Sequence, residues 1–264
     1  MKKLTARQGK IAALAAALAV LLAAAGVLWA NRPVPRRENG VELLDFPLGS
    51  KLQGYDVYDS QGRALDISQI SSAPTLIVFA MAQCGDCRAE FPSYGALLTL
   101  FNTEAFQVAF VWDDAVPQED LDKLHIPPSA SYSAKGRYKF TDWVPSYYFV
   151  DGEDVITAQT KDLAEVAPLL PETAVVPESF RQFSGGLPVL LGIEGCGSCK
   201  EALGEMEAAY GDSFLYFLEG QEAVAEGSKK NVLADPHQLV AKAFGVDTFP
   251  ASIRLDGAGG LLVE

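Results

Sequence analysis

Apolar and polar positions along this chain follow the same order of elements twice. Each copy begins with an apolar run that predicts a buried strand and continues with a stretch of helical character. Each later has a short strand that a proline opens and Asp-Gly closes. The strands are expected at 75–80 and 189–193, the helices at 85–101 and 198–210, and the proline-led strands at 144–152 and 249–257. The pattern indicates two copies of one α/β unit.

The remaining periodicity completes each copy. In the first copy we expect a hairpin of 52–58 with 63–67, a strand at 107–112, a short acidic helix at 117–124, a hairpin of 147–150 with 155–158, and a helix at 163–170. In the second copy we expect a strand at 214–218, a helix at 237–244, and a hairpin of 253–255 with 261–263.

The second copy is expected to lack the closing helix. A bare sheet face exposes several large apolar side chains, each worth about 1.5–3 kcal/mol when buried. We therefore expect this face to dock against the first copy or against the segment 180–183.

The N-terminal segment predicts membrane insertion. Residues 11–30 are 20 positions without a charge, and a helix of that length spans roughly 30 Å, the thickness of a bilayer core. Four basic residues precede it, which favours a cytoplasmic N-terminus. A cleaved signal peptide is the alternative, although Leu28-Trp29-Ala30 is a poor cleavage site. Either route places the rest of the chain in an oxidising compartment.

These observations divide the chain into six segments. They are a basic tail at 1–10, a transmembrane signal anchor at 11–30, a tether at 31–41, a first domain at 42–170, a linker at 171–178 and a second domain at 179–264. The predicted fold class is α/β. It consists of two tandem domains, each a mixed central sheet flanked by helices, after one N-terminal transmembrane helix.

The charge distribution argues against nucleic acid as a partner. The chain has a formal net charge of −13, and seven of its 21 Lys and Arg lie in the first 37 residues, which contain no acid. The remaining segment therefore has 14 basic and 34 acidic residues, a net charge of −20. Such a body repels a polyanion.

The candidate chemistry lies in two Cys-x-x-Cys pairs, Cys84 with Cys87 and Cys196 with Cys199, each after a predicted strand and at the start of a predicted helix. Cysteines at i and i+3 of one turn bring their sulfurs within bonding distance. The first sulfur meets unpaired N–H groups and the positive end of the helix dipole, which favours its thiolate. We therefore expect Cys84 and Cys196 to attack, and Cys87 and Cys199 to resolve the mixed disulfide.

Two other interpretations of the pairs have to be weighed. A structural disulfide is one, but the stabilisation by a disulfide grows with loop length and is small for so short a loop. A zinc site is the other, because Cys-x-x-Cys is also half of a zinc-binding motif. Pro145 and Pro250, if cis, would pack against the sulfurs and leave little room for a metal. We expect no metal and no cofactor.

The chain resembles two tandem thioredoxin-fold domains, and its pattern is most similar to the TlpA-like, membrane-anchored thiol–disulfide oxidoreductases. The stretch from Phe79 to Pro92 matches the family's strand, Cys-x-x-Cys and Arg-x-Glu-x-Pro. In the second copy, Ala234-Asp235-Pro236 with 240–246 resembles the family's approach to its cis-proline. The resemblance covers roughly residues 45–264. Gln83 and Gly195 depart from it, because the family usually has Trp before the first cysteine.

The resemblance implies roles for residues around the cysteines. Pro145 and Pro250 would follow cis peptide bonds, which seldom occur by accident in a fold. The backbone of Val144 and Phe249 would then pair with a substrate strand.

Three further kinds of residue complete the prediction. Asp86 would oppose the thiolate and make the dithiol more reducing, and Glu90 is a second candidate for tuning the potential, although both could be solvated helix residues. His125 and His237 lie in polar helical stretches without an evident partner, so we expect them at the surface. The run from Tyr147 to Phe149 is expected in the strand core.

Two functions are compatible with these patterns. The resemblance implies an extracytoplasmic thiol–disulfide oxidoreductase acting on exported protein thiols or disulfides, by family-level analogy with cytochrome c maturation. A membrane electron donor would be a further partner. It would be a single-pass plasma-membrane protein with a cytoplasmic N-terminus. The alternative is a non-catalytic binding scaffold of two thioredoxin domains with static disulfides.

Overall fold

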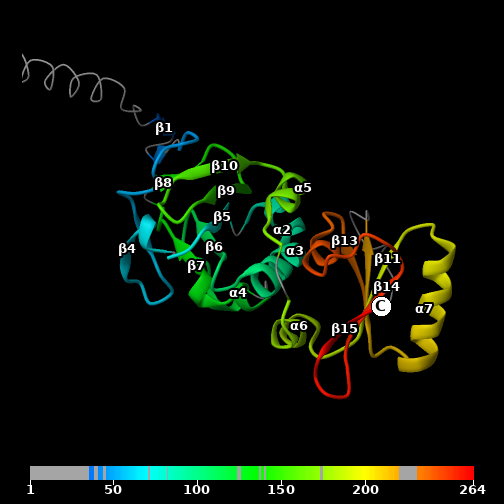
Figure 1. Cartoon of the computed structure of the whole chain (residues 1–264). Helices are drawn as coiled ribbons and strands as arrows, with labels where there is room; N and C mark the ends of the chain where they lie inside the picture. Colours follow the sequence, from blue (N-terminus) through cyan, green and yellow to red (C-terminus); the bar gives the residue numbers. More distant parts are fainter. Residues whose placement is uncertain are drawn as a thin grey trace, which may run out of the picture.

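The computed structural model builds the chain around two large mixed β-sheets, one in each predicted copy (Figure 1). The residues that it describes are 36–38, 41–43, 46–70, 72–81, 83–123, 126–136, 138–139, 141–172, 175–219 and 231–264. A small third sheet consists of β1 (Arg36–Glu38), β2 (Val41–Leu43) and β8 (Tyr138–Lys139). These two sequence copies are called the first and second units below.

The first unit has a seven-stranded sheet in the order β10-β9-β5-β6-β7-β3-β4. Its strands are β3 (Asp56–Tyr58), β4 (Ala64–Asp66), β5 (Thr75–Ala80), β6 (Gln107–Trp112), β7 (Ser131–Ser133), β9 (Ser146–Val150) and β10 (Ile156–Thr160). The central strand β5 pairs in parallel with β6 and antiparallel with β9. All its residues are buried, because Leu76 and Val78 face one apolar cluster and Ile77 and Phe79 face another. The predicted bounds of β5 and β6 are confirmed.

The predicted helix 85–101 is present but divided. It consists of α2 (Gly85–Ala89), α3 (Phe91–Ala96) and a π-helical turn, η2 (Leu97–Phe101). Glu90 ends α2 and begins α3. The break follows from Pro92, since proline lacks a backbone N–H and is tolerated at the first turn of a helix but not inside one.

The other helical segments of the first unit are short. They are η1 (Ile67–Gln69), α4 (Gln118–Lys123), η3 (Pro128–Ala130), α5 (Leu163–Val166) and η4 (Ala167–Leu169). The acidic helix and the closing helix were both predicted, and α4, α5 and η4 confirm them. The strand β7 was not predicted.

The second unit repeats the arrangement around its own central strand. Its elements are α6 (Pro177–Ser184), β11 (Val189–Ile193), α7 (Gly197–Tyr210), β12 (Leu215–Glu219), β13 (Val232–Asp235), α8 (Leu239–Ala243), β14 (Ala251–Leu255) and β15 (Leu261–Val263). The strand order is β13-β12-β11-β14-β15. Like β5, β11 has a parallel neighbour, β12, and an antiparallel one, β14. The helix α6 begins in the predicted linker and crosses the predicted boundary at residue 179.

The two units pack against each other, as the sequence predicted. Helices α6 and α8 contact η2, and α8 also contacts α3. Helix α6 is itself packed within the second unit, where the rings of Phe180 and Phe244 meet edge to face with centroids 5.8 Å apart and Phe183 stacks on Phe217 at 5.4 Å. One apolar cluster runs from the core of the first unit into the second.

The docked face differs from the expected one. In the first unit α5 lies on the same side of the sheet as α2 and α3, in the cluster of Leu76 and Val78. The corresponding place in the second unit is beside α7, and there an open groove of about 400 Å³ runs along β14, between Leu190, Met206 and Ser252. Figure 1 shows α7 on the outer side of its sheet, away from the first unit. The first unit instead packs on the side of α6 and α8, where one apolar cluster joins the two units.

Within the described part of the chain, no helix is both long and apolar enough to cross a bilayer. The predicted tail at 1–10 and anchor at 11–30 lie outside the described residues, as do residues 31–35 of the tether and His125.

Candidate active site

The first cysteine pair forms an asymmetric dithiol at the start of α2. Both cysteines are free thiols, Cys84 partly exposed and Cys87 buried. Cys84 is the residue before the helix, and its Sγ accepts a hydrogen bond of 3.2 Å from the backbone N–H of Cys87. Burial, helped by the neighbouring sulfur of Cys84, raises the pKa of Cys87 to about 12. The Cys84 sulfur is therefore accessible to another molecule, while the Cys87 sulfur stays protonated beneath it.

The predicted proline loop lies against the accessible sulfur. The bond between Val144 and Pro145 is cis, as expected. The Sγ of Cys84 donates to the carbonyl oxygen of Val144 at 3.7 Å. The fold thus brings together three residues that the sequence placed in one site.

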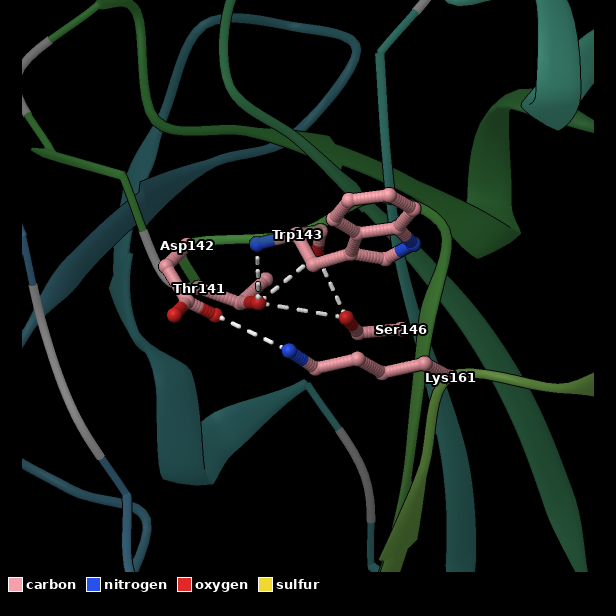
Figure 2. Close-up of polar contacts among 5 residues, drawn as sticks. All are labelled: Thr141, Asp142, Trp143, Ser146 and Lys161. Carbon is pink, nitrogen blue, oxygen red and sulfur yellow. Dashed lines mark hydrogen bonds and ion pairs between the residues drawn. The ribbon is translucent and has the colours of Figure 1, made fainter.

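Hydrogen bonds within the loop hold it in place (Figure 2). The hydroxyl of Thr141 accepts from the backbone N–H of Trp143 at 3.0 Å and contacts the hydroxyl of Ser146 at 3.1 Å. Ser146 in turn donates to the carbonyl of Trp143. On the other side, Nζ of Lys161 lies 3.3 Å from Asp142 and 5.8 Å from the centroid of the Trp143 ring. The loop is anchored on both sides of its tryptophan.

Trp143 is a candidate functional residue that the sequence analysis missed. Its side chain is 53% exposed, and it directly precedes Val144 beside the Cys84 sulfur. Gln83, and not a tryptophan, precedes the first cysteine in this chain. The signal that could have found it is a tryptophan next to the Val-Pro pair.

Two buried tyrosines lie beneath the dithiol. The hydroxyls of Tyr94 and Tyr147 are 3.2 Å apart. Burial is the main cause of a raised pKa for both, and the negative charges of Glu90 and ionised Cys87 raise these pKa values further. The buried positions from Tyr147 to Phe149 confirm the predicted strand core.

The two predicted tuning residues have different surroundings. Asp86 is exposed in the first turn of α2, between the cysteines. Glu90 is partly buried, and its Oε2 lies 3.1 Å from Nε2 of His237. The expectation of a surface His237 without a partner is therefore wrong. Docking of the second unit brings this histidine to Glu90, and the hydrogen bond between them is the main cause of its raised pKa.

The second cysteine pair has the same local geometry. Cys196 and Cys199 form a disulfide with Cα atoms 5.3 Å apart. Cys196 precedes α7, and its sulfur accepts from the backbone N–H of Cys199 at 3.1 Å. The bond between Phe249 and Pro250 is cis, as expected, and Pro250 lines the groove beside α7.

The described residues contain no group of three or more His, Cys, Asp or Glu side chains placed to hold a metal ion. The first cysteine pair offers a partly exposed thiol that can attack, with a buried second thiol three residues further along.

Comparisons with known proteins found distant likenesses among solved structures. The thioredoxin domain of a thiol-disulfide oxidoreductase from Bacteroides vulgatus is 18% identical, over 48% of this chain and 100% of that one, with a TM-score of 0.35. A thiol:disulfide interchange protein from Bacteroides sp. is 18% identical, over 43% and 81%, with a TM-score of 0.32. The C-terminal domain of an uncharacterized protein from Bacteroides fragilis is 16% identical, over 47% and 96%, with a TM-score of 0.38.

No protein-family model and no curated protein matches the chain. The low identities and TM-scores above decide neither the fold nor an activity. The fold follows from the strand order and pairing, and the chemistry from the geometry of the two cysteine pairs.

Proposed function

We propose that this protein is a thioredoxin-like thiol–disulfide oxidoreductase that acts on protein disulfides. The observation that carries the proposal is the contact between the accessible sulfur of Cys84 and the carbonyl of Val144, at 3.7 Å, in the cis-proline loop. This places the attacking atom next to backbone that can pair with an extended substrate. A purely structural cysteine pair does not require such a surface.

The reaction proceeds by two exchanges. The Cys84 thiolate attacks one sulfur of a substrate disulfide, forming a mixed disulfide and releasing the other substrate sulfur as a thiolate. Cys87 then loses its proton and attacks the Cys84 sulfur, which releases the second substrate thiolate. Two electrons pass from the protein dithiol to the substrate, and the two protons end on the substrate thiols. The same steps run in reverse when the substrate is a dithiol.

Burial of Cys87 sets the order of events. With its pKa raised to about 12, Cys87 is protonated at neutral pH and does not compete for the substrate. Only the thiolate is a nucleophile, so resolution waits until a proton acceptor is available.

The second unit carries out the same exchange in this proposal. Cys196 attacks, Cys199 resolves, and the backbone of Phe249 before Pro250 meets the substrate. The support is the matching position of Cys196 before α7 and the cis bond at Pro250.

The location and the partners are also part of the proposal. Residues 11–30 anchor the chain in the plasma membrane with a cytoplasmic N-terminus, and both units face the extracytoplasmic side. Their substrates are thiols or disulfides of exported proteins, and a membrane dithiol donor returns electrons to the oxidised form. The support is the uncharged 20-residue run behind a basic tail.

A redox titration tests the activity. The full-length chain is equilibrated at defined ratios of reduced to oxidised glutathione or dithiothreitol, alkylated, and analysed peptide by peptide. Two results together support the enzyme. Cys84 and Cys87 show a reversible two-electron transition, and the Cys87→Ser variant accumulates mixed disulfides between Cys84 and substrate proteins. Cysteines that stay oxidised under strong reductant contradict it and favour the static scaffold.

A further inference from the structure

One polar contact joins the second unit to the neighbourhood of the first dithiol. Nε2 of His237 lies 3.1 Å from Oε2 of Glu90, and the two side chains are only 17% and 22% exposed. Glu90 is the residue between α2, which carries both cysteines, and α3. Its carboxylate makes no capping hydrogen bond to α3. Its described partner is His237, which belongs to the second unit and lies beside Glu90 because the two units are docked.

Glu90 and the buried Cys87 are linked through a backbone hydrogen bond and through the same pair of buried tyrosines. The backbone N–H of Glu90 donates to the carbonyl of Cys87 at 3.2 Å. The charges of Glu90 and Cys87 both act on the same hydroxyl pair, Tyr94 and Tyr147. The Glu90 carboxylate and the dithiol therefore border the same buried hydroxyl pair, where screening by solvent is weak.

Three carboxylates act on the charge of His237. They belong to Glu90 at the junction of α2 and α3, Asp162 before α5, and Asp235 at the end of β13. The hydrogen bond with Glu90 raises the pKa of His237, burial lowers it, and the charges of the three carboxylates raise it further. The imidazole is therefore well placed to carry a positive charge against Glu90.

We propose that His237 is a positioning residue for the first dithiol, which holds and partly neutralises the Glu90 carboxylate so that the second unit helps to set the redox equilibrium of the first. This inference rests on the proposed oxidoreductase function. Loss of the imidazole leaves the Glu90 charge to oppose the thiolate of the reduced dithiol. Opposing the thiolate destabilises the reduced form, so the dithiol becomes a stronger reductant.

The test is a double-mutant cycle read out at one dithiol. The full-length chain is equilibrated with redox buffers at pH 6.5, and the state of Cys84 and Cys87 is measured by alkylation and peptide mass spectrometry. His237→Gln is expected to lower the equilibrium constant for reduction about threefold, roughly 14 mV at 29.6 mV per tenfold change. Glu90→Gln moves the constant in the opposite direction. In the Glu90→Gln background, His237→Gln has no further effect, and in the wild-type background His237→Lys restores the constant toward its original value.

Two controls separate the charge of His237 from the packing around α8. Lys242→Gln removes a charge from α8 and is expected to leave the constant unchanged. Phe244→Leu trims the apolar contact between α6 and the end of α8 inside the second unit, and it is also expected to leave the constant unchanged. If Phe244→Leu reproduces the shift, or if His237→Gln acts equally in the Glu90→Gln background, the inference is overturned.

The failure of this inference differs from the failure of the proposed function. A wild-type dithiol without a reversible transition overturns both. A reversible transition that His237→Gln does not move overturns the positioning role alone.

Discussion

The sulfur of Cys84 lies 3.7 Å from the carbonyl oxygen of Val144, although 60 positions separate the two residues in the chain. Cys84 follows the carboxyl end of the central strand β5, and the antiparallel neighbour β9 begins just after the proline that follows Val144. A substrate strand that pairs with this backbone would present its disulfide to the sulfur directly. In the proposed mechanism, this contact puts the attacking sulfur beside the backbone that would receive the substrate.

The first prediction concerns the order in which the thiols react. In the reduced protein at pH 7, iodoacetamide should label Cys84 well before Cys87, because Cys87 is buried and its pKa is raised to about 12. Labelling of Cys87 should accelerate steadily as the pH rises toward that value, since only the thiolate reacts. Mass spectrometry of the two alkylation products measures this. Faster labelling of Cys87 at neutral pH would reverse the assigned roles.

Much of this site could be predicted from local patterns. The spacing of Cys84 and Cys87 after an apolar run was enough to place them at a helix start, and the resemblance to thioredoxin-fold proteins implied the cis bond at Pro145. The partner of His237 could not be predicted, because Glu90 belongs to the other unit and only docking brings the two together. The exposure of Trp143 likewise depends on how the loop folds back on Thr141 and Ser146.

The second prediction concerns substrate recognition by Trp143. Trp143→Ala should slow the reduction of protein disulfides about tenfold, which corresponds to roughly 1.4 kcal/mol of lost binding. Turnover of a small disulfide such as oxidised glutathione should change little, because it does not extend over the loop. The ratio of kcat/KM values for the two substrates measures the effect. Trp143→Phe, which keeps an aromatic ring, serves as the control, and an equal loss with both substrates would argue against a docking role.

The third prediction concerns the buried tyrosine pair. Tyr147→Phe should destabilise the fold by about 1–3 kcal/mol, because it leaves the hydroxyl of Tyr94 buried without its partner. The double variant Tyr94→Phe with Tyr147→Phe removes both polar groups and should cost less than the sum of the two single changes. Urea unfolding of the four proteins completes the cycle. Additive costs would show that the two hydroxyls do not depend on each other.

In the fold as well, local sequence patterns predicted individual elements, whereas the particular contacts between distant segments were not predicted. Continuous apolar runs predicted β5 and β6 to the residue, whereas β7 and β13 are too short to produce a period. The sequence also predicted docking, but on the wrong face. The pattern predicted the helix that became α8, did not predict α6, and carried no sign that both helices meet η2 of the first unit. The groove beside α7 was therefore expected to be the covered surface.

The fourth prediction concerns the coupling of the units. Phe180 is fully buried and lies in α6, which contacts η2 of the first unit, so Phe180→Ala should cost about 3–5 kcal/mol. The fragment 175–264 should also be less stable than the same residues in the whole chain, since it exposes the apolar side of α6 and α8. Calorimetry of the fragment and the full-length protein compares the two. A well-behaved monomeric fragment with unchanged stability would mean that the units fold independently.

The fifth prediction concerns the pH dependence of stability through His237. The hydrogen bond with Glu90 raises the folded-state pKa of His237 above its ordinary value of 6.5. A group with a raised folded pKa binds its proton more tightly in the folded state. Its contribution is therefore fully present below the unfolded pKa and is lost as the pH rises through the folded pKa.

The free energy of unfolding should accordingly differ most between wild type and His237→Gln at pH 5.5, and the difference should shrink on the way to pH 8.5. A hydrogen bond to a charged group is worth about 1.5–3 kcal/mol, which sets the scale of the low-pH difference. Urea unfolding across this range measures it, with Glu90→Gln as the control that should flatten the same part of the curve. A difference that stays constant with pH would show that His237 contributes by packing and that its charge does not act on Glu90.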